Sequence, residues 1–138
     1  MGTLERLQKY IYDYLRGIND LKYAAVNKES EINLSPVGSD EGLDINVMFP
    51  IPQKASKFAA GPTFSEVEIC LEVRRQDVIA ARAPSMLTVC EIVSRALHNW
   101  TPPLETGYGR ITLSQNQPWE KMSADTIKIR FNVQSVLL

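Results

Sequence analysis

The sequence has little of the chemistry that metal sites and nucleophilic active sites use. Its 138 residues contain one histidine, His98, and two cysteines, Cys70 and Cys90. A structural zinc site usually takes four Cys or His ligands, so a zinc site of the usual kind is excluded. We expect both cysteines to be buried, reduced thiols, because free cysteine packs as a small apolar side chain. The sequence therefore predicts no metal and no cofactor.

An excess of charge and long apolar runs are also absent. Fifteen Lys and Arg nearly balance sixteen Asp and Glu, which leaves a net charge of −1. This balance argues against a protein that holds nucleic acid mainly through charge, and we expect no specific nucleic-acid site. No window approaches the ~20 apolar residues of a membrane-spanning helix, and residues 1–19 lack the apolar segment of a signal peptide. We expect a soluble protein without a membrane partner, made in a reducing cytoplasm.

The apolar fraction, in contrast, is ordinary for a globular protein, at 44%. A chain of this length buries roughly two-thirds of its unfolded surface and needs no disulfide to be stable. We therefore expect a single domain that spans residues 1–138.

Two segments have the apolar spacing of amphipathic helices. In residues 3–18, apolar side chains recur at steps of three and four, and Thr3 is the expected N-cap. Residues 84–100 repeat the spacing; Pro84 suits a first turn, and Thr101 with the two prolines after it ends the helix. The two stripes comprise Leu4, Leu7, Ile11, Tyr14, Leu15 and Ile18, and then Met86, Val89, Cys90, Val93, Leu97 and Trp100.

Alternation of apolar and polar residues predicts strands between and after these helices. It is clearest in residues 64–75, and residues 43–49 and 124–136 also alternate well. Weaker patterns suggest short strands at 23–26, 31–34 and 110–113, a turn at 37–42, and a polar, irregular stretch at 114–123. Strands gathered in runs between helices indicate an α+β fold, with an antiparallel sheet and two helices packed on one face.

Residues 50–62 contain three prolines and are longer than a usual connection. Pro50 and Pro52 cannot donate ladder hydrogen bonds, so a central strand is disfavoured here. The segment is either a projecting arm or flap, or a plain long hairpin loop, and the sequence leaves both open.

No catalytic set is recognisable. Glu66, Glu68 and Glu72 share one strand face, where they stand side by side rather than across a cleft, with Lys128 and Arg130 as cross-strand partners. His98 lies eight residues after Cys90, about 12 Å along a helix, too far for a hydrogen bond. The Gly-x-Gly at residues 107–109 is a turn, not a phosphate loop. We expect no enzyme, no catalytic residue and no small-molecule substrate.

The exit of the second helix resembles a known family. Residues 94–103 (SRALHNWTPP), a glycine loop and residues 110–113 (RITL) are similar to tail-terminator and minor tail proteins of long-tailed bacteriophages, including those of Mu-like prophages. The order of elements over nearly the whole chain is also similar. Position by position, only Leu97, Trp100 and Pro102 match, and our reading of the residues makes these three structural.

The resemblance implies an α+β protein without an active site that assembles as a ring, commonly a hexamer. Such a ring caps the tail tube and joins it to the head, so the implied partners are copies of itself, the tail tube and head-completion proteins. It also implies a protein of the virion tail, made in the bacterial cytoplasm. Because a ring contact needs a projecting element, we place the oligomer interface in the 50–62 segment and in two loop aromatics: Pro50, Pro52, Lys54, Lys57, Phe58, Tyr108 and Trp119.

Three hypotheses remain in this order. The first is a structural tail protein that acts by oligomerising. The second is a non-enzymatic adaptor or binding module that uses the polar strand face. The third is a small enzyme with a pocket between helix and sheet.

Overall fold

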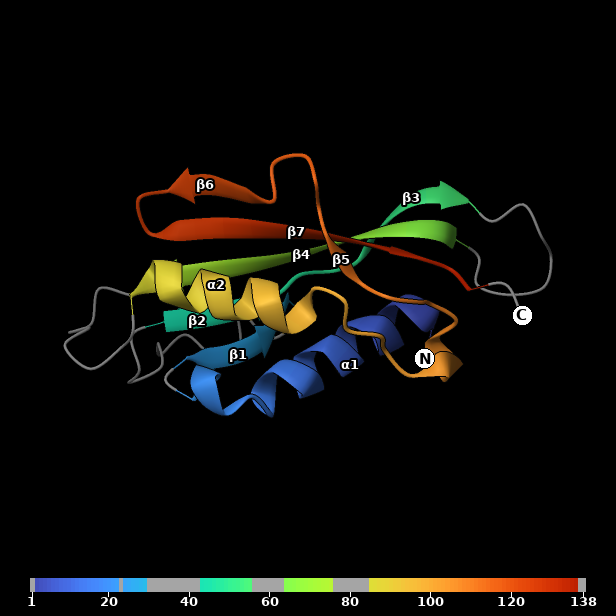
Figure 1. Cartoon of the computed structure of the whole chain (residues 1–138), viewed down its shortest axis with the longest axis horizontal. Helices are drawn as coiled ribbons and strands as arrows, with labels where there is room; N and C mark the ends of the chain where they lie inside the picture. Colours follow the sequence, from blue (N-terminus) through green and yellow to red (C-terminus); the bar gives the residue numbers. More distant parts are fainter. Residues whose placement is uncertain (1, 23, 30–42, 56–63, 76–84, 137–138) are drawn as a thin grey trace.

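Two α-helices and a seven-stranded sheet make up the part of the chain that the computed structural model describes, which is residues 2–22, 24–29, 43–55, 64–75 and 85–136 (Figure 1). Two short 3₁₀ turns, η1 and η3, accompany them. In chain order the elements are α1 (Thr3–Arg16), η1 (Asn19–Leu21), β1 (Ala25–Lys28), β2 (Leu43–Val47), β3 (Ile51–Ala55), β4 (Phe64–Arg75), α2 (Met86–Leu97), η3 (Leu104–Thr106), β5 (Thr112–Leu113), β6 (Trp119–Ser123) and β7 (Thr126–Gln134).

The long antiparallel pair of β4 and β7 is the centre of the sheet, and nine residue pairs hold it in register. β2 and β3 follow one another along the outer edge of β4, and β6 and β5 do the same along β7. β1 covers the outer edge of β2. The sheet is twisted, so β3 and β6 lie at opposite ends of the molecule (Figure 1). The expectation that the 50–62 segment holds no central strand is confirmed, because β3 is an edge strand.

The sheet is mixed, so the prediction of a purely antiparallel sheet is wrong. β1 pairs with β2 in parallel, with Val26 opposite Ile45. A two-residue turn can join only antiparallel neighbours, whereas a parallel pair needs a connection of roughly a dozen residues or more. The 14 residues between Lys28 and Leu43 meet that requirement. The α+β class itself is confirmed.

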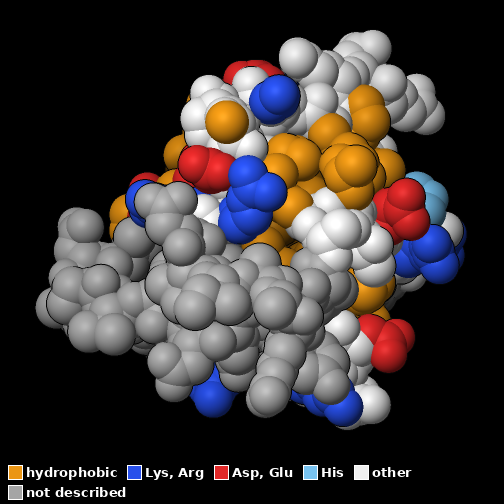
Figure 2. Space-filling view, turned by 90° about the vertical axis from the view of Figure 1, so that its left-hand side faces the viewer, with side chains coloured by type: hydrophobic (Ala, Val, Ile, Leu, Met, Phe, Trp, Pro, Cys, Tyr) orange, Lys and Arg blue, Asp and Glu red, His pale blue; other side chains and the backbone are white. Residues whose placement is uncertain are grey.

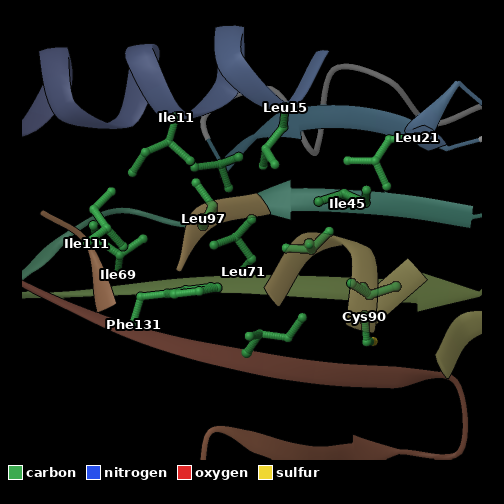
Figure 3. Close-up of a cluster of buried hydrophobic side chains, with 14 of the residues drawn as sticks. Ile11, Leu15, Leu21, Ile45, Ile69, Leu71, Cys90, Leu97, Ile111 and Phe131 are labelled. Atoms are coloured by element: carbon green, nitrogen blue, oxygen red, sulfur yellow. The ribbon is translucent and has the colours of Figure 1, made fainter. Parts of the chain in front are cut away.

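One core lies between the helices and one face of the sheet (Figure 3). Leu7, Ile11 and Leu15 of α1 are fully buried, as the helical spacing predicts. On the sheet, the inward residues of β4 lie opposite those of β7 in register: Val67 with Val133, Ile69 with Phe131, Leu71 with Ile129 and Val73 with Ile127. α2 completes the core with Val89, Cys90, Val93 and Leu97. Both helices lie on the same side of the sheet (Figure 1), as predicted.

The helix starts differ from expectation in one case. Gly2 is the N-cap of α1, without a side-chain cap, so Thr3 belongs to the first turn and the predicted Thr3 cap is wrong. Ser85 caps α2, because its Oγ accepts a hydrogen bond from the Thr88 N–H at 3.1 Å. Pro84 lies outside the described residues, and so do the strand expected at 31–34 and the turn expected at 37–42.

The exit of α2 is tied to α1. The rings of Trp100 and Tyr14 stack with centroids 4.3 Å apart, and the Tyr14 hydroxyl donates to the Ala96 carbonyl at 3.1 Å. Asn99 then adopts a left-handed conformation, with φ 69°, and its N–H donates to the Ile111 carbonyl. Asparagine tolerates this conformation better than most residues. The Leu-x-x-Trp exit therefore holds the two helices together, which agrees with a structural role for these residues.

Strand β6 was not foreseen. Residues 119–123 lie in the stretch predicted to be irregular, yet they pair with β7, with Trp119 opposite Ile129. The segment Trp-Glu-Lys-Met-Ser has no apolar alternation, so only its pairing with the long β7 template makes it a strand. The weaker strands shift or shorten: 23–26 becomes Ala25–Lys28, and 110–113 becomes Thr112–Leu113.

Replacing Leu71 by alanine tests the position of the core. Leu71 is fully buried in β4, so Leu71→Ala leaves a cavity and should lower the free energy of unfolding by about 2–5 kcal/mol. Leu104→Ala is the matched control, because Leu104 is 71% exposed and should cost no more than about 0.5 kcal/mol. Urea denaturation of both variants measures the difference, and equal losses would contradict this core.

Candidate functional site

The edge strand β3 is the described part of the segment that we predicted to form a contact. All five of its residues are exposed, and only one of its edges is paired, with β4. Pro52 therefore sits where a missing N–H is tolerated, and Lys54 pairs with Glu66 at 3.4 Å. Pro50, just before the strand, is buried. Lys57 and Phe58 lie outside the described residues.

Two large apolar side chains are exposed at the beginning of β3. Phe49 is 48% exposed and Ile51 is 51% exposed. The Phe49 N–H donates to the Glu29 carboxylate instead of to a neighbouring strand, and this separates β2 from β3. Exposed apolar side chains that lie close together mark contact surfaces more often than single ones do. The start of β3 is therefore a candidate contact surface.

A second apolar surface lies at the end of the molecule where α2 begins and β6 ends. Leu87 of α2 is 56% exposed and Met122 of β6 is 48% exposed. Figure 2 shows this end, and hydrophobic side chains gather on it. It lies away from β3, which is at the other end of the sheet (Figure 1). The described residues thus expose apolar side chains at two separate places.

The two aromatics predicted as loop anchors are placed differently from expectation. Tyr108 is fully buried, so the expectation that it is exposed is wrong. The left-handed Gly107, with φ 77°, and a bridge to Ser135 turn the ring into the core. Burial raises the pKa of Tyr108, and an interaction with Thr3 partly offsets the rise. Trp119 is half-buried, and its Nε1 donates to Ser94 Oγ at 2.9 Å.

The face of the sheet opposite the helices is polar. Glu66, Glu68 and Glu72 lie on it, as predicted, and Glu72 is opposite Lys128 in the register. Arg130, however, pairs with Glu120 of β6 and not with a carboxylate of β4. No described helix covers this face, which was expected to serve the adaptor hypothesis.

The charges of this face are balanced internally. The hydrogen bond from Arg130 lowers the pKa of Glu120 and raises that of Arg130 itself. Cys70 lies between these groups, and its Sγ donates to Glu68 Oε1 at 3.2 Å. Burial, followed by the contact with Glu68, raises the pKa of Cys70 to about 12. The same carboxylates and cations that decorate the face thus satisfy one another.

The described residues bring no nucleophile and base together. Both cysteines are free and buried, as predicted, and burial raises the pKa of Cys90 to about 11. His98 accepts a hydrogen bond on Nδ1 from the Leu113 N–H at 3.0 Å, so it caps a backbone group. Within the described ranges, no group of three or more His, Cys, Asp or Glu residues is arranged to hold a metal ion. No described helix is long and apolar enough to cross a membrane.

Comparison with known protein families, with curated proteins and with solved structures finds no match for this chain.

The raised pKa values of the two thiols predict slow reaction and a loss of stability in alkali. At about pH 8 the native protein should react with a thiol reagent far more slowly than the protein in urea. The folded chain keeps these protons up to about pH 11 to 12, whereas the model thiol loses its own at 9.0. The associated stabilisation is therefore complete below pH 9 and is lost as the pH rises toward 11.

Urea denaturation across this pH range, with Cys90→Ala beside the natural sequence, measures the effect. The variant should lose less stability between neutral and alkaline pH, because one of the two thiols is gone. Fast labelling of both thiols in the native protein would contradict the burial on which this prediction rests.

Proposed function

We infer that this chain is a structural subunit of a phage or prophage tail, of the tail-terminator type. It acts by assembling with copies of itself into a ring that caps the tail tube and joins it to the head. The partners are then copies of the same chain, the tail tube and head-completion proteins, and the place of action is the virion tail, after synthesis in the bacterial cytoplasm. The proposal includes no catalysis.

The observation that carries this proposal is the pair of separate apolar surfaces on one rigid sheet. One comprises Phe49 and Ile51 at the start of β3, and the other comprises Leu87 and Met122. A ring needs a heterologous contact, in which one surface of a subunit meets a different surface of the next. Two unlike apolar surfaces at opposite ends of a subunit suit such a contact, and the resemblance at the α2 exit supports the same class of protein.

A second candidate function is an adaptor that binds a partner on the polar face of the sheet. The observation in its favour is that no described helix covers this face, which β2, β4, β7 and β6 share. This reading predicts a monomer or dimer in solution, so the oligomeric state separates the two candidates.

Light scattering behind size exclusion, at several concentrations, is the direct test. The ring reading expects a discrete oligomer, on the order of six chains, that grows in population with concentration. Ile51→Glu places a charge in the first apolar surface and should abolish the oligomer. Leu104→Glu is the matched control, since Leu104 is 71% exposed on η3 and belongs to neither surface.

A mixing experiment distinguishes a heterologous contact from a two-fold one. Met122→Glu disrupts the second surface but leaves the first intact, and Ile51→Glu does the reverse. If the two surfaces meet each other, each variant alone is monomeric and the mixture forms a heterodimer that cannot grow further. Two monomeric variants that stay monomeric when mixed, or a Leu104→Glu variant that dissociates equally, would remove the support for this ring contact.

A further inference from the structure

A polar pocket lies at the outer edge of β7, away from both apolar surfaces. Its volume is about 400 Å³, which is within the usual range for small-ligand sites. The side chains and backbone around it are Gly109, Arg110, Thr112, Asn132, Gln134, Ser135 and Val136. The pocket therefore joins the segment before β5 to the last part of β7.

A bulge in the strand pairing creates this pocket. Tyr108 bridges Ser135, and Thr112 is opposite Asn132, so four steps along one segment match three along the other. The extra residue lies between them, where the Ile111 N–H donates to the Trp100 carbonyl at 2.8 Å instead of to β7. Bulges of this kind redirect side chains and are frequent beside functional sites.

The redirected side chain is that of Arg110. Tyr108 and Ile111 are both fully buried in the core, whereas Arg110 between them is exposed and lines the pocket. Without the extra residue, Tyr108 and Ile111 would point to opposite faces of the sheet, because side chains alternate along a strand. The bulge thus buries both and leaves the guanidinium at the pocket.

The pocket is lined by hydrogen-bond donors and contains no carboxylate. Among the described residues, no ion pair or side-chain hydrogen bond engages Arg110, and the side-chain amides of Asn132 and Gln134 are likewise unengaged. The nearest acids in the register are Glu68, opposite Asn132, and Glu66, opposite Gln134. Both are engaged elsewhere: Glu66 with Lys54, and Glu68 with Cys70.

We propose that this pocket binds an oxyanion, the carboxylate or phosphate group of a small ligand. Arg110 supplies the positive charge and a planar pair of donors, which suits both groups. Asn132 and Gln134 donate from the floor of β7, and the hydroxyls of Thr112 and Ser135 complete the donor set. The site is independent of the ring contact, because none of its residues belongs to the two apolar surfaces.

Amide chemical shifts of the isotope-labelled full chain test the proposal. Inorganic phosphate and succinate are titrated separately, with sodium chloride at matched ionic strength as the control. At least one of the two should shift the amides of Gly109, Arg110 and residues 132–135 along a saturable curve, and sodium chloride should not. The probe that saturates at lower concentration identifies the group as phosphate or carboxylate.

Two variants assign the binding to the donors. Arg110→Gln removes the charge but keeps length and polarity, and it should weaken binding at least about tenfold. Asn132→Asp adds a repelling charge at nearly constant shape and should do the same. Lys121→Gln removes an exposed cation of β6 outside the pocket and should leave binding unchanged.

Three results would overturn the proposal. They are shifts that grow linearly with both probes, shifts that sodium chloride reproduces, and an affinity that Arg110→Gln and Lys121→Gln reduce equally. The oligomeric state of Arg110→Gln, measured in parallel, keeps this outcome separate from that of the ring proposal.

Discussion

The pairing of β4 with β7 is the constraint on which the rest of the structure depends. Nine residue pairs hold two long strands in one register, and a slip of one residue would move every apolar side chain of one strand to the polar face. Both strands alternate strictly, so the register places all their apolar residues on the helix side. Every other strand then adds to one of the two outer edges of this pair.

The edges of the sheet follow from the different lengths of these strands. β4 is longer than β2, so β3 occupies the remaining part of its edge, and β6 and β5 divide the edge of β7. Both outer edges carry features that limit unspecific strand pairing. β3 contains Pro52 and Lys54, and β6 contains Glu120 and Lys121, with a register shift in each. A neighbour is therefore better held by side chains than by extension of the sheet.

The sequence predicted those parts of the fold that a local period dictates. The α1 stripe of Leu7, Ile11 and Leu15, and the bounds of β4, follow from spacing alone. The parallel β1 and the strand β6 could not be predicted in this way, because each is defined by a partner distant in the chain. Tyr108 failed for a related reason: a glycine loop suggests exposure, but a bulge three residues later reverses the side on which the ring lies.

The candidate site was predictable only in part. The prolines of residues 50–62 indicated an edge position, and β3 has it. The exposed Phe49, Leu87 and Met122 gave no signal, because each fits an apolar position of its own element, and only the arrangement of the strands shows which positions the core leaves outside. Arg110 gave none either, since a bulge depends on pairing and not on a local pattern.

The energetics of the two kinds of surface favour the apolar ends over the polar face as the place of assembly. On the polar face, Arg130 already pairs with Glu120, and Lys54 pairs with Glu66. A partner that covered these pairs would remove them from water, and the cost of desolvating charges commonly equals or exceeds the attraction between them. Burial of Ile51 or Met122 carries no such cost and gains roughly 25 cal/mol for each Å² of apolar surface. A face whose charges are satisfied internally therefore serves better as a solvated exterior, and the unlike apolar ends serve better as the joints between subunits.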